Sequence, residues 1–104
     1  MIFFDWGKSE LSGDGKATLD RIATEFAASG KAQLTLSSHS DRSGSSIVNL
    51  AMSRKRAEVA AAYLESKGIA PAAIRIVAVG EADQLIQTDD GVREIQNRRI
   101  DIQF

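Results

Sequence analysis

Residues 32–68, AQLTLSSHSDRSGSSIVNLAMSRKRAEVAAAYLESKG, pass from a strand through a polar loop into a long helix. The first seven residues alternate Leu34 and Leu36 with polar neighbours, which is typical of a half-buried strand. The polar stretch SSHSDRSGSS follows at 37–46. A strand joined to a long helix is a building unit of α/β folds, so this stretch indicates the fold class.

The helix of this unit has recognisable start and stop signals. Ser45 or Ser46 can cap its N-terminus, because a serine hydroxyl accepts a hydrogen bond from a backbone N–H of the first turn. The sequence then predicts helix from about residue 47 to 67, where Gly68 and Pro71 supply the stop. This is the longest element that we expect in the chain.

The elements on either side follow the same alternation of strands and helices. We expect a strand at 1–5, a helix at 12–29 ended by Gly30, a strand at 72–80, a loop at 82–91, a helical turn near 92–96 and a strand at 98–104. The order is βαβαβ(α)β. Because crossovers are right-handed, both long helices should lie on one face of the sheet. The predicted fold is α/β (α+β), a two-layer sandwich with a mixed four-stranded sheet.

Composition excludes several classes of function. The chain has 104 residues, 43% of them hydrophobic, so we expect one packed domain over residues 1–104. A net charge of −1 lacks the basic excess that nucleic-acid binding needs. The absence of cysteine excludes disulfides, and no apolar run is long enough to span a membrane. Because strand material begins almost at once, we expect a domain excised from a longer protein, with Met1 as an added initiator.

The polar stretch 37–46 invites three readings that its spacing disfavours. A serine-rich turn before a helix is more simply a cap than a phosphate site, and no glycine-rich phosphate motif is present. Neighbours in an extended chain point to opposite faces, so Ser38 and Ser40 cannot easily reach His39 for catalysis. His39 and Asp41 do share a face, and a hydrogen bond between them would order the loop. One histidine and an Asp-Asp-Gly turn at 89–91 make a poor metal site.

The long helix has an apolar stripe and a polar flank. The stripe that should face the core contains Leu50, Ala57, Ala61 and Leu64. The flank contains Asn49, Ser53, Arg56 and Tyr63. Side chains on a helix lean toward its N-terminus, so Arg56 should point back toward the loop that holds Asp41.

Two arrangements of Asp41 and Arg56 are compatible with this geometry. The first is an ordinary intramolecular ion pair, which base rates favour. In the second the charges stay apart, so that Asp41 accepts an ammonium and Arg56 grips a carboxylate, which together recognise a zwitterion. Arg98 and Arg99 point to opposite faces in a strand, so at most one of them can join such a pocket.

Five blocks of the sequence also resemble one known family. They are FFDWGKSEL at 3–11, SHSDRSG at 38–44, NLAMSRKRAEVAAAYL at 49–64, VGE at 79–81 and GVREIQNRRIDI at 91–102. In this order and spacing they resemble the OmpA-like peptidoglycan-binding domain of the OmpA, Pal and MotB type. The resemblance implies a periplasmic module that is no enzyme, needs no cofactor or metal, and binds peptidoglycan to anchor the envelope. Any contact with a membrane would come from parts of the parent protein outside residues 1–104.

The resemblance also implies roles for particular residues. In this family the zwitterionic end of a diaminopimelate side chain is held non-covalently. Asp41 matches the aspartate that takes the ammonium, and Arg56, fifteen positions on, matches the arginine that takes the carboxylate. The other positions that match the family's site are Asn49, Ser40, Arg98 and Asp5.

Some positions depart from the family's pattern. Ser38 and Ser40 stand where glycine and threonine are usual, and Trp6 and Gly7 replace a small residue and an asparagine in a segment that borders the pocket. Loss of contacts at Trp6 and Gly7 would lower affinity. These departures favour an alternative function, in which a degenerate domain keeps the fold and serves as a protein-interaction or assembly module.

Overall fold

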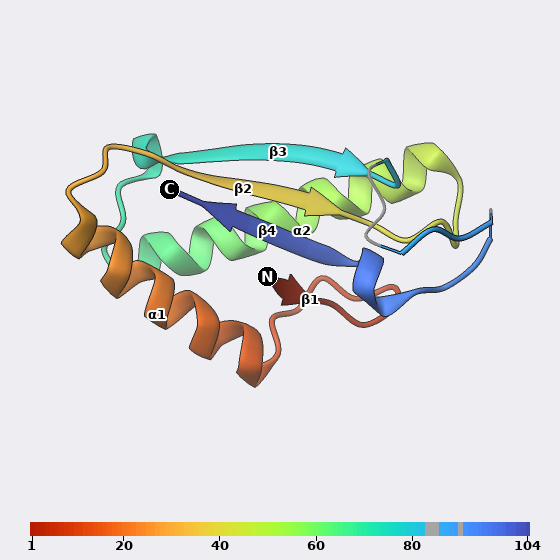
Figure 1. The fold of residues 1–104 in the computed structure, drawn as a ribbon, viewed down its shortest axis with the longest axis horizontal. Coiled ribbons are helices and arrows are strands. Elements are labelled where there is room, and N and C mark those ends of the chain that lie inside the picture. The colour runs from red at the N-terminus through yellow and green to blue at the C-terminus, as the bar shows by residue number, and fades with distance from the viewer. Residues whose placement is uncertain (83–85, 90) are drawn as a thin grey trace.

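The computed structural model describes residues 1–82, 86–89 and 91–104 of the chain. Its elements in order are β1 (Ile2–Phe3), α1 (Gly13–Ser29), β2 (Leu34–His39), α2 (Ser46–Ser66), the 3-10 turn η1 (Pro71–Ala73), β3 (Ile74–Gly80), the 3-10 turn η2 (Ile95–Asn97) and β4 (Arg99–Gln103) (Figure 1). The predicted order is confirmed, with η1 as an addition before β3. Part of the loop predicted at 82–91 lies outside the described residues.

The four strands form one mixed sheet in the order β1-β4-β2-β3. Strands β2 and β3 are parallel, whereas β4 is antiparallel to both β2 and β1. The parallel pair needs a crossover, and α2 supplies it while packing on both of its strands. This topology brings the C-terminal end of β2 beside the N-terminal end of β4.

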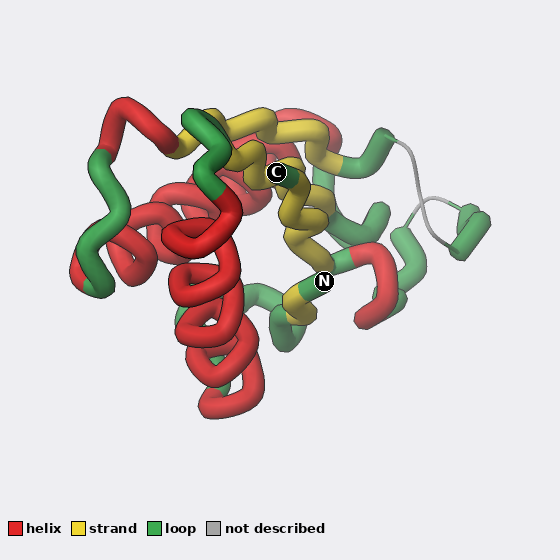
Figure 2. The backbone as a smooth tube through the Cα atoms, turned by 60° about the vertical axis from the view of Figure 1, so that its left-hand side comes forward, coloured by secondary structure: helices red, strands yellow, loops and turns green. Residues whose placement is uncertain are grey.

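One face of the sheet carries the core. Leu36 pairs with Ile102 and Ser38 pairs with Ile100, so these side chains share a face with Leu34. The helices cover this face with Leu19, Ala23 and Phe26 from α1 and Ala60, Ala61 and Leu64 from α2. Both helices therefore lie on the same side of the sheet, as predicted, and Figure 2 shows them in red beside the yellow strands.

Both long helices begin at a serine cap. Ser12 accepts from the backbone N–H of Gly15 at 3.0 Å, and Ser45 accepts from that of Val48 at 3.2 Å. Ser45, and not Ser46, is thus the cap of α2. Helix α1 ends at Gly30, whose φ of 71° is in the left-handed region that glycine adopts without strain.

The predicted apolar stripe of α2 is partly wrong. Leu50 is 44% exposed, whereas Asn49 and Ser53 of the predicted flank are buried. The reason is that the first half of α2 lies over the ends of β2 and β3, where Ser53 accepts from the backbone N–H of Gly80 at 3.1 Å. Polar groups at the strand ends need polar partners, so the polar stripe faces inward there.

Within the described residues, no helix has the length and apolarity that a membrane crossing requires.

Candidate functional site

A pocket of about 110 Å³ lies where β2 ends, α2 begins and the loop after β1 passes by. Its lining residues are Trp6, Gly7, Ser40, Asp41, Ser43, Gly44, Val48, Asn49, Met52, Arg56 and Arg98. Five of the six predicted site residues are among them. The exception is Asp5, which is exposed and borders a separate hollow of about 530 Å³ beside β1 and the start of α1.

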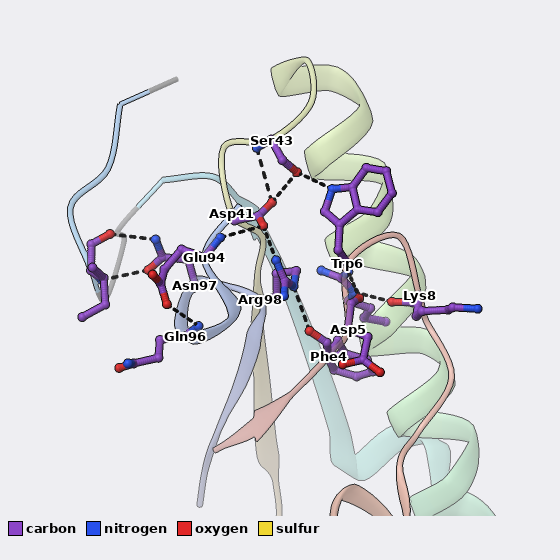
Figure 3. A network of polar contacts seen from close by, with 12 residues as sticks. Phe4, Asp5, Trp6, Lys8, Asp41, Ser43, Glu94, Gln96, Asn97 and Arg98 are labelled. Atoms are coloured by element: carbon purple, nitrogen blue, oxygen red, sulfur yellow. Dashed lines mark hydrogen bonds and ion pairs between the residues drawn. The ribbon is translucent and has the colours of Figure 1, made fainter. Parts of the chain in front are cut away.

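Asp41 lies just after β2, and both of its carboxylate oxygens accept hydrogen bonds that hold it in place (Figure 3). Its Oδ1 accepts from the hydroxyl of Ser43 at 2.7 Å and the backbone N–H of Ser43 at 3.3 Å. Its Oδ2 accepts from Arg98 Nη1 at 2.5 Å and from the backbone N–H of Glu94 at 3.1 Å. Burial alone would raise the pKa of Asp41, but the hydrogen bonds from Ser43, Arg98 and Glu94 outweigh it. The pKa is lowered, and Asp41 is a carboxylate at neutral pH.

Arg56 is buried in the third turn of α2 and holds the loop after β1. Only 1% of the residue is exposed. Its Nε donates to the carbonyl of Lys8 at 2.8 Å and its Nη2 to that of Asp5 at 3.3 Å. Its Nη1 has no hydrogen-bond partner among the described residues. Burial, and then the charge of Arg98, lowers the pKa of Arg56 to about 10, which leaves the guanidinium charged at neutral pH.

The two charges do not form the ion pair that base rates favoured. Asp41 pairs with Arg98, and Arg56 donates to backbone carbonyls instead. Arg98 is in place because it directly precedes β4, which lies antiparallel to β2, and because its Nε donates to the carbonyl of Phe4 at 2.8 Å. The pocket therefore contains one buried anion and two buried cations.

The remaining predicted lining residues add polar atoms. Asn49 is buried and donates from its side-chain amide to the carbonyl of Gly44 at 3.0 Å. Ser40 is also buried, and its hydroxyl has no partner within the part of the chain that the structure describes. The backbone N–H of Ser40 donates to Gly80 at 2.7 Å, which fixes the loop against β3.

The predicted hydrogen bond between His39 and Asp41 is wrong. The strand register shifts between Ser38 and His39, so the regular alternation on which that prediction rests ends there. The ring of His39 instead lies on the opposite face of the sheet, 3.5 Å from a carboxylate oxygen of Asp101. Ser38 itself is a fully buried residue of β2 and does not line the pocket.

Several lining residues escaped the sequence argument. The bond from the Asp41 carboxylate to the backbone two residues on is an ordinary turn motif, and this signal could have identified Ser43. Val48 and Met52 supply apolar walls of the pocket. In the sequence they cannot be told apart from apolar residues on any other helix. The donor at Glu94 is a backbone group, so the residue type at this position does not indicate it.

Among the described residues, no group of three His, Cys, Asp or Glu side chains is placed to hold a metal ion.

The sandwich and its pocket define an α/β domain with a charged pocket at one end of the sheet. Residues 3–98 match the OmpA family, and the chain belongs to it. It is 34% identical to the peptidoglycan-associated lipoprotein of Rhizobium meliloti (strain 1021), over 94% of this chain and 56% of that protein. The chain therefore spans little more than half the length of that relative.

A further relative and one solved structure are also similar to the chain. The chain is 30% identical to the peptidoglycan-binding protein ArfA of Mycobacterium bovis, over 81% of this chain and 26% of that protein. The crystal structure of the peptidoglycan-associated lipoprotein from Burkholderia pseudomallei superposes with a TM-score of 0.87 at 26% identity, and covers 97% of this chain and 86% of that one. This likeness agrees with the two-layer sandwich.

Proposed function

We propose that this domain binds peptidoglycan non-covalently and holds the zwitterionic end of a diaminopimelate residue in the pocket at Asp41. The names of its relatives, a peptidoglycan-associated lipoprotein and a peptidoglycan-binding protein, support the polymer as partner. One observation carries the finer proposal. Arg56 Nη1 is buried without a partner among the residues that the structure describes, and it belongs to the same pocket as an ionised carboxylate. A buried donor of a charged group is costly to leave without an acceptor, so a ligand carboxylate is the natural complement of Nη1.

The charges of the pocket suit a zwitterion. Asp41, Arg56 and Arg98 together carry a net charge of +1, so a ligand carboxylate is attracted first. Asp41 then accepts the ligand ammonium. Because its four acceptor positions are already occupied, we expect the ammonium to displace the longest of its bonds, which is that from the backbone N–H of Ser43. The hydroxyl of Ser40, which has no partner in the described part of the chain, offers one further contact.

The affinity of one such site should be modest. Two charge-assisted hydrogen bonds contribute together about 3–6 kcal/mol, which corresponds to a Kd near the millimolar range. Val48 and Met52 can pack against the methylenes of the ligand. A polymer that displays many copies raises the effective concentration, so weak sites suffice for a tether. We accordingly place the domain in the periplasm as a wall-binding module of a longer envelope protein.

The proposal is tested by titrating the domain with free diaminopimelate under NMR and by cosedimentation with insoluble peptidoglycan. Arg56→Lys keeps a positive charge but loses the planar fork, and we expect it to weaken binding at least about tenfold. Arg54→Lys is the matched control, because Arg54 is an exposed arginine of the same helix. Lysine with its α-amino and α-carboxyl groups blocked is the control ligand, since it offers a side-chain ammonium without a zwitterionic end.

Arg56 also holds the loop after β1, so each variant must be shown to be folded by circular dichroism at the assay temperature. Wild-type chemical shifts at Asp41 and Arg56 that do not respond to millimolar diaminopimelate would refute the ligand. Absence of cosedimentation as well would favour the alternative function as a protein-interaction module.

A further inference from the structure

Trp6 stands at the rim of the pocket and touches the groups that hold Asp41. The residue is 48% exposed and is the only tryptophan in the sequence. It belongs to the loop after β1, whereas its contacts come from the loop after β2 and from the segment before η2. From the sequence, a loss of ligand contacts at Trp6 would lower affinity. The structure shows that Trp6 makes contacts within the protein, to Ser43 and Arg93.

The first contact commits the hydroxyl of Ser43 to Asp41. The indole Nε1–H of Trp6 donates to Ser43 Oγ at 2.8 Å, and that hydroxyl donates to Asp41 Oδ1 at 2.7 Å (Figure 3). An indole N–H is a donor only, so the hydroxyl hydrogen cannot point toward the ring. With one lone pair occupied by Trp6, the hydroxyl has Asp41 as its acceptor. Without the indole, the same hydroxyl is free to rotate toward water.

The second contact reaches the other carboxylate oxygen. The guanidinium carbon of Arg93 lies 3.5 Å from the centre of the Trp6 ring, which is a stacked cation–π arrangement. The next residue, Glu94, donates its backbone N–H to Asp41 Oδ2. Trp6 thereby braces a donor to each oxygen of Asp41, one through Ser43 and one through Arg93.

From these contacts we infer that Trp6 is a positioning residue of the pocket, which fixes the Asp41 carboxylate for a ligand ammonium through the hydroxyl of Ser43. The identity of the ligand in this inference rests on the proposed function. The relay itself, the two hydrogen bonds from Trp6 to Ser43 and from Ser43 to Asp41, does not. A carboxylate that is fixed before the ligand arrives loses less conformational freedom on binding. Trp6 should therefore increase the affinity for zwitterionic amino-acid ends.

The relay is tested by the pKa of Asp41, measured from its side-chain carboxyl resonance in NMR titrations. Trp6→Phe keeps the ring and removes the N–H, and Ser43→Ala removes the hydroxyl. Each should raise the pKa of Asp41, because each weakens a hydrogen bond to the charged form. In the Ser43→Ala background, Trp6→Phe should have no further effect through this route. Ser43→Thr keeps the hydroxyl and should restore the pKa, and Ser46→Ala is the control for loss of a nearby serine.

Ligand affinity provides the second readout. Trp6→Phe should weaken diaminopimelate binding about threefold to tenfold, the range expected for one neutral hydrogen bond. In the Ser43→Ala background the same substitution should change affinity less than twofold. The single indole N–H resonance should shift in Ser43→Ala and during the ligand titration.

The outcomes separate the two hypotheses. An Asp41 pKa that is unchanged in Trp6→Phe, or additive effects in the double variant, would overturn the relay whatever the ligand does. Tighter binding by Trp6→Phe would overturn it as well. A wild-type domain that ignores diaminopimelate while the Asp41 pKa follows the expected pattern would refute the proposed ligand and support the relay.

Discussion

The substitution Asp41→Asn tests how strongly the buried ion pair with Arg98 stabilises the fold. The exchange keeps the size of the side chain and removes its charge, which leaves Arg98 without a counter-ion at 7% exposure. Breaking a buried pair from one side costs about 3–5 kcal/mol. Because Arg98 keeps its bond to the carbonyl of Phe4, we expect the lower end, about 3 kcal/mol. The melting temperature of a domain of this size should fall by about 12–24 °C.

A matched control isolates the effect of burial. Arg21 and Glu25 form an ion pair on α1 with side chains 63% and 49% exposed. Glu25→Gln should lower the free energy of unfolding by less than about 0.5 kcal/mol, since exposed pairs of this spacing contribute little. Urea denaturation of both variants gives the comparison directly. Similar losses for Asp41→Asn and Glu25→Gln would refute the reasoning.

A double-mutant cycle tests whether the cost comes from the stranded charge. Arg98→Met removes the guanidinium and fills much of its volume, but leaves the Asp41 carboxylate buried with fewer donors. The double variant Asp41→Asn with Arg98→Met should lose less free energy of unfolding than the sum of the single variants, by at least about 1.5 kcal/mol. Strict additivity would show that the two side chains do not stabilise each other.

The same pair makes stability depend on pH with a defined sign. The pKa of Asp41 is lower in the folded protein than the value of about 3.9 for an unfolded aspartate, so the unfolded chain binds more protons in acid. The stability from Asp41 is therefore present above about pH 3.9 and is lost as the pH falls through the folded pKa. In this window Asp41→Asn should lose less stability than the wild type, and an equal loss would contradict the shift.

Two further pairs of substitutions test the frame that positions the pocket. Gly80→Ala should destabilise the domain by about 1 kcal/mol more than Gly68→Ala. Both glycines have a positive φ, but only at Gly80 would a Cβ meet the backbone of Leu50, at 3.2 Å. Equal melting temperatures would show that the backbone moves to relieve this contact. Ser45→Ala should lower the free energy of unfolding by about 1 kcal/mol and Ser46→Ala by much less, since only Ser45 caps α2, and thermal unfolding would contradict this if Ser46→Ala were the more harmful.

Sequence reasoning succeeded where local patterns determine structure. Apolar periodicity, a serine cap at Ser45 or Ser46 and the glycine after α1 predict the two long helices and the strands within two residues of their observed ends. These signals depend on neighbours along the chain, so no tertiary information is required. The helical pattern of α2 wrongly predicts that Leu50 is buried. The helix extends past the core toward the strand ends, which a pattern within one helix cannot reveal.

At the site, too, local sequence patterns predict only part of the arrangement. The spacing of Asp41 and Arg56 correctly indicates that both groups reach one pocket, because a β2–α2 unit has few ways to fold. It cannot indicate which cation Asp41 pairs with, since that choice depends on how β4 lies against β2 and brings Arg98 within reach. This pairing bears on the proposed function. With Arg98 beside Asp41, Arg56 keeps a buried donor that has no partner among the described residues, and the proposed ligand carboxylate would neutralise the excess positive charge of the pocket.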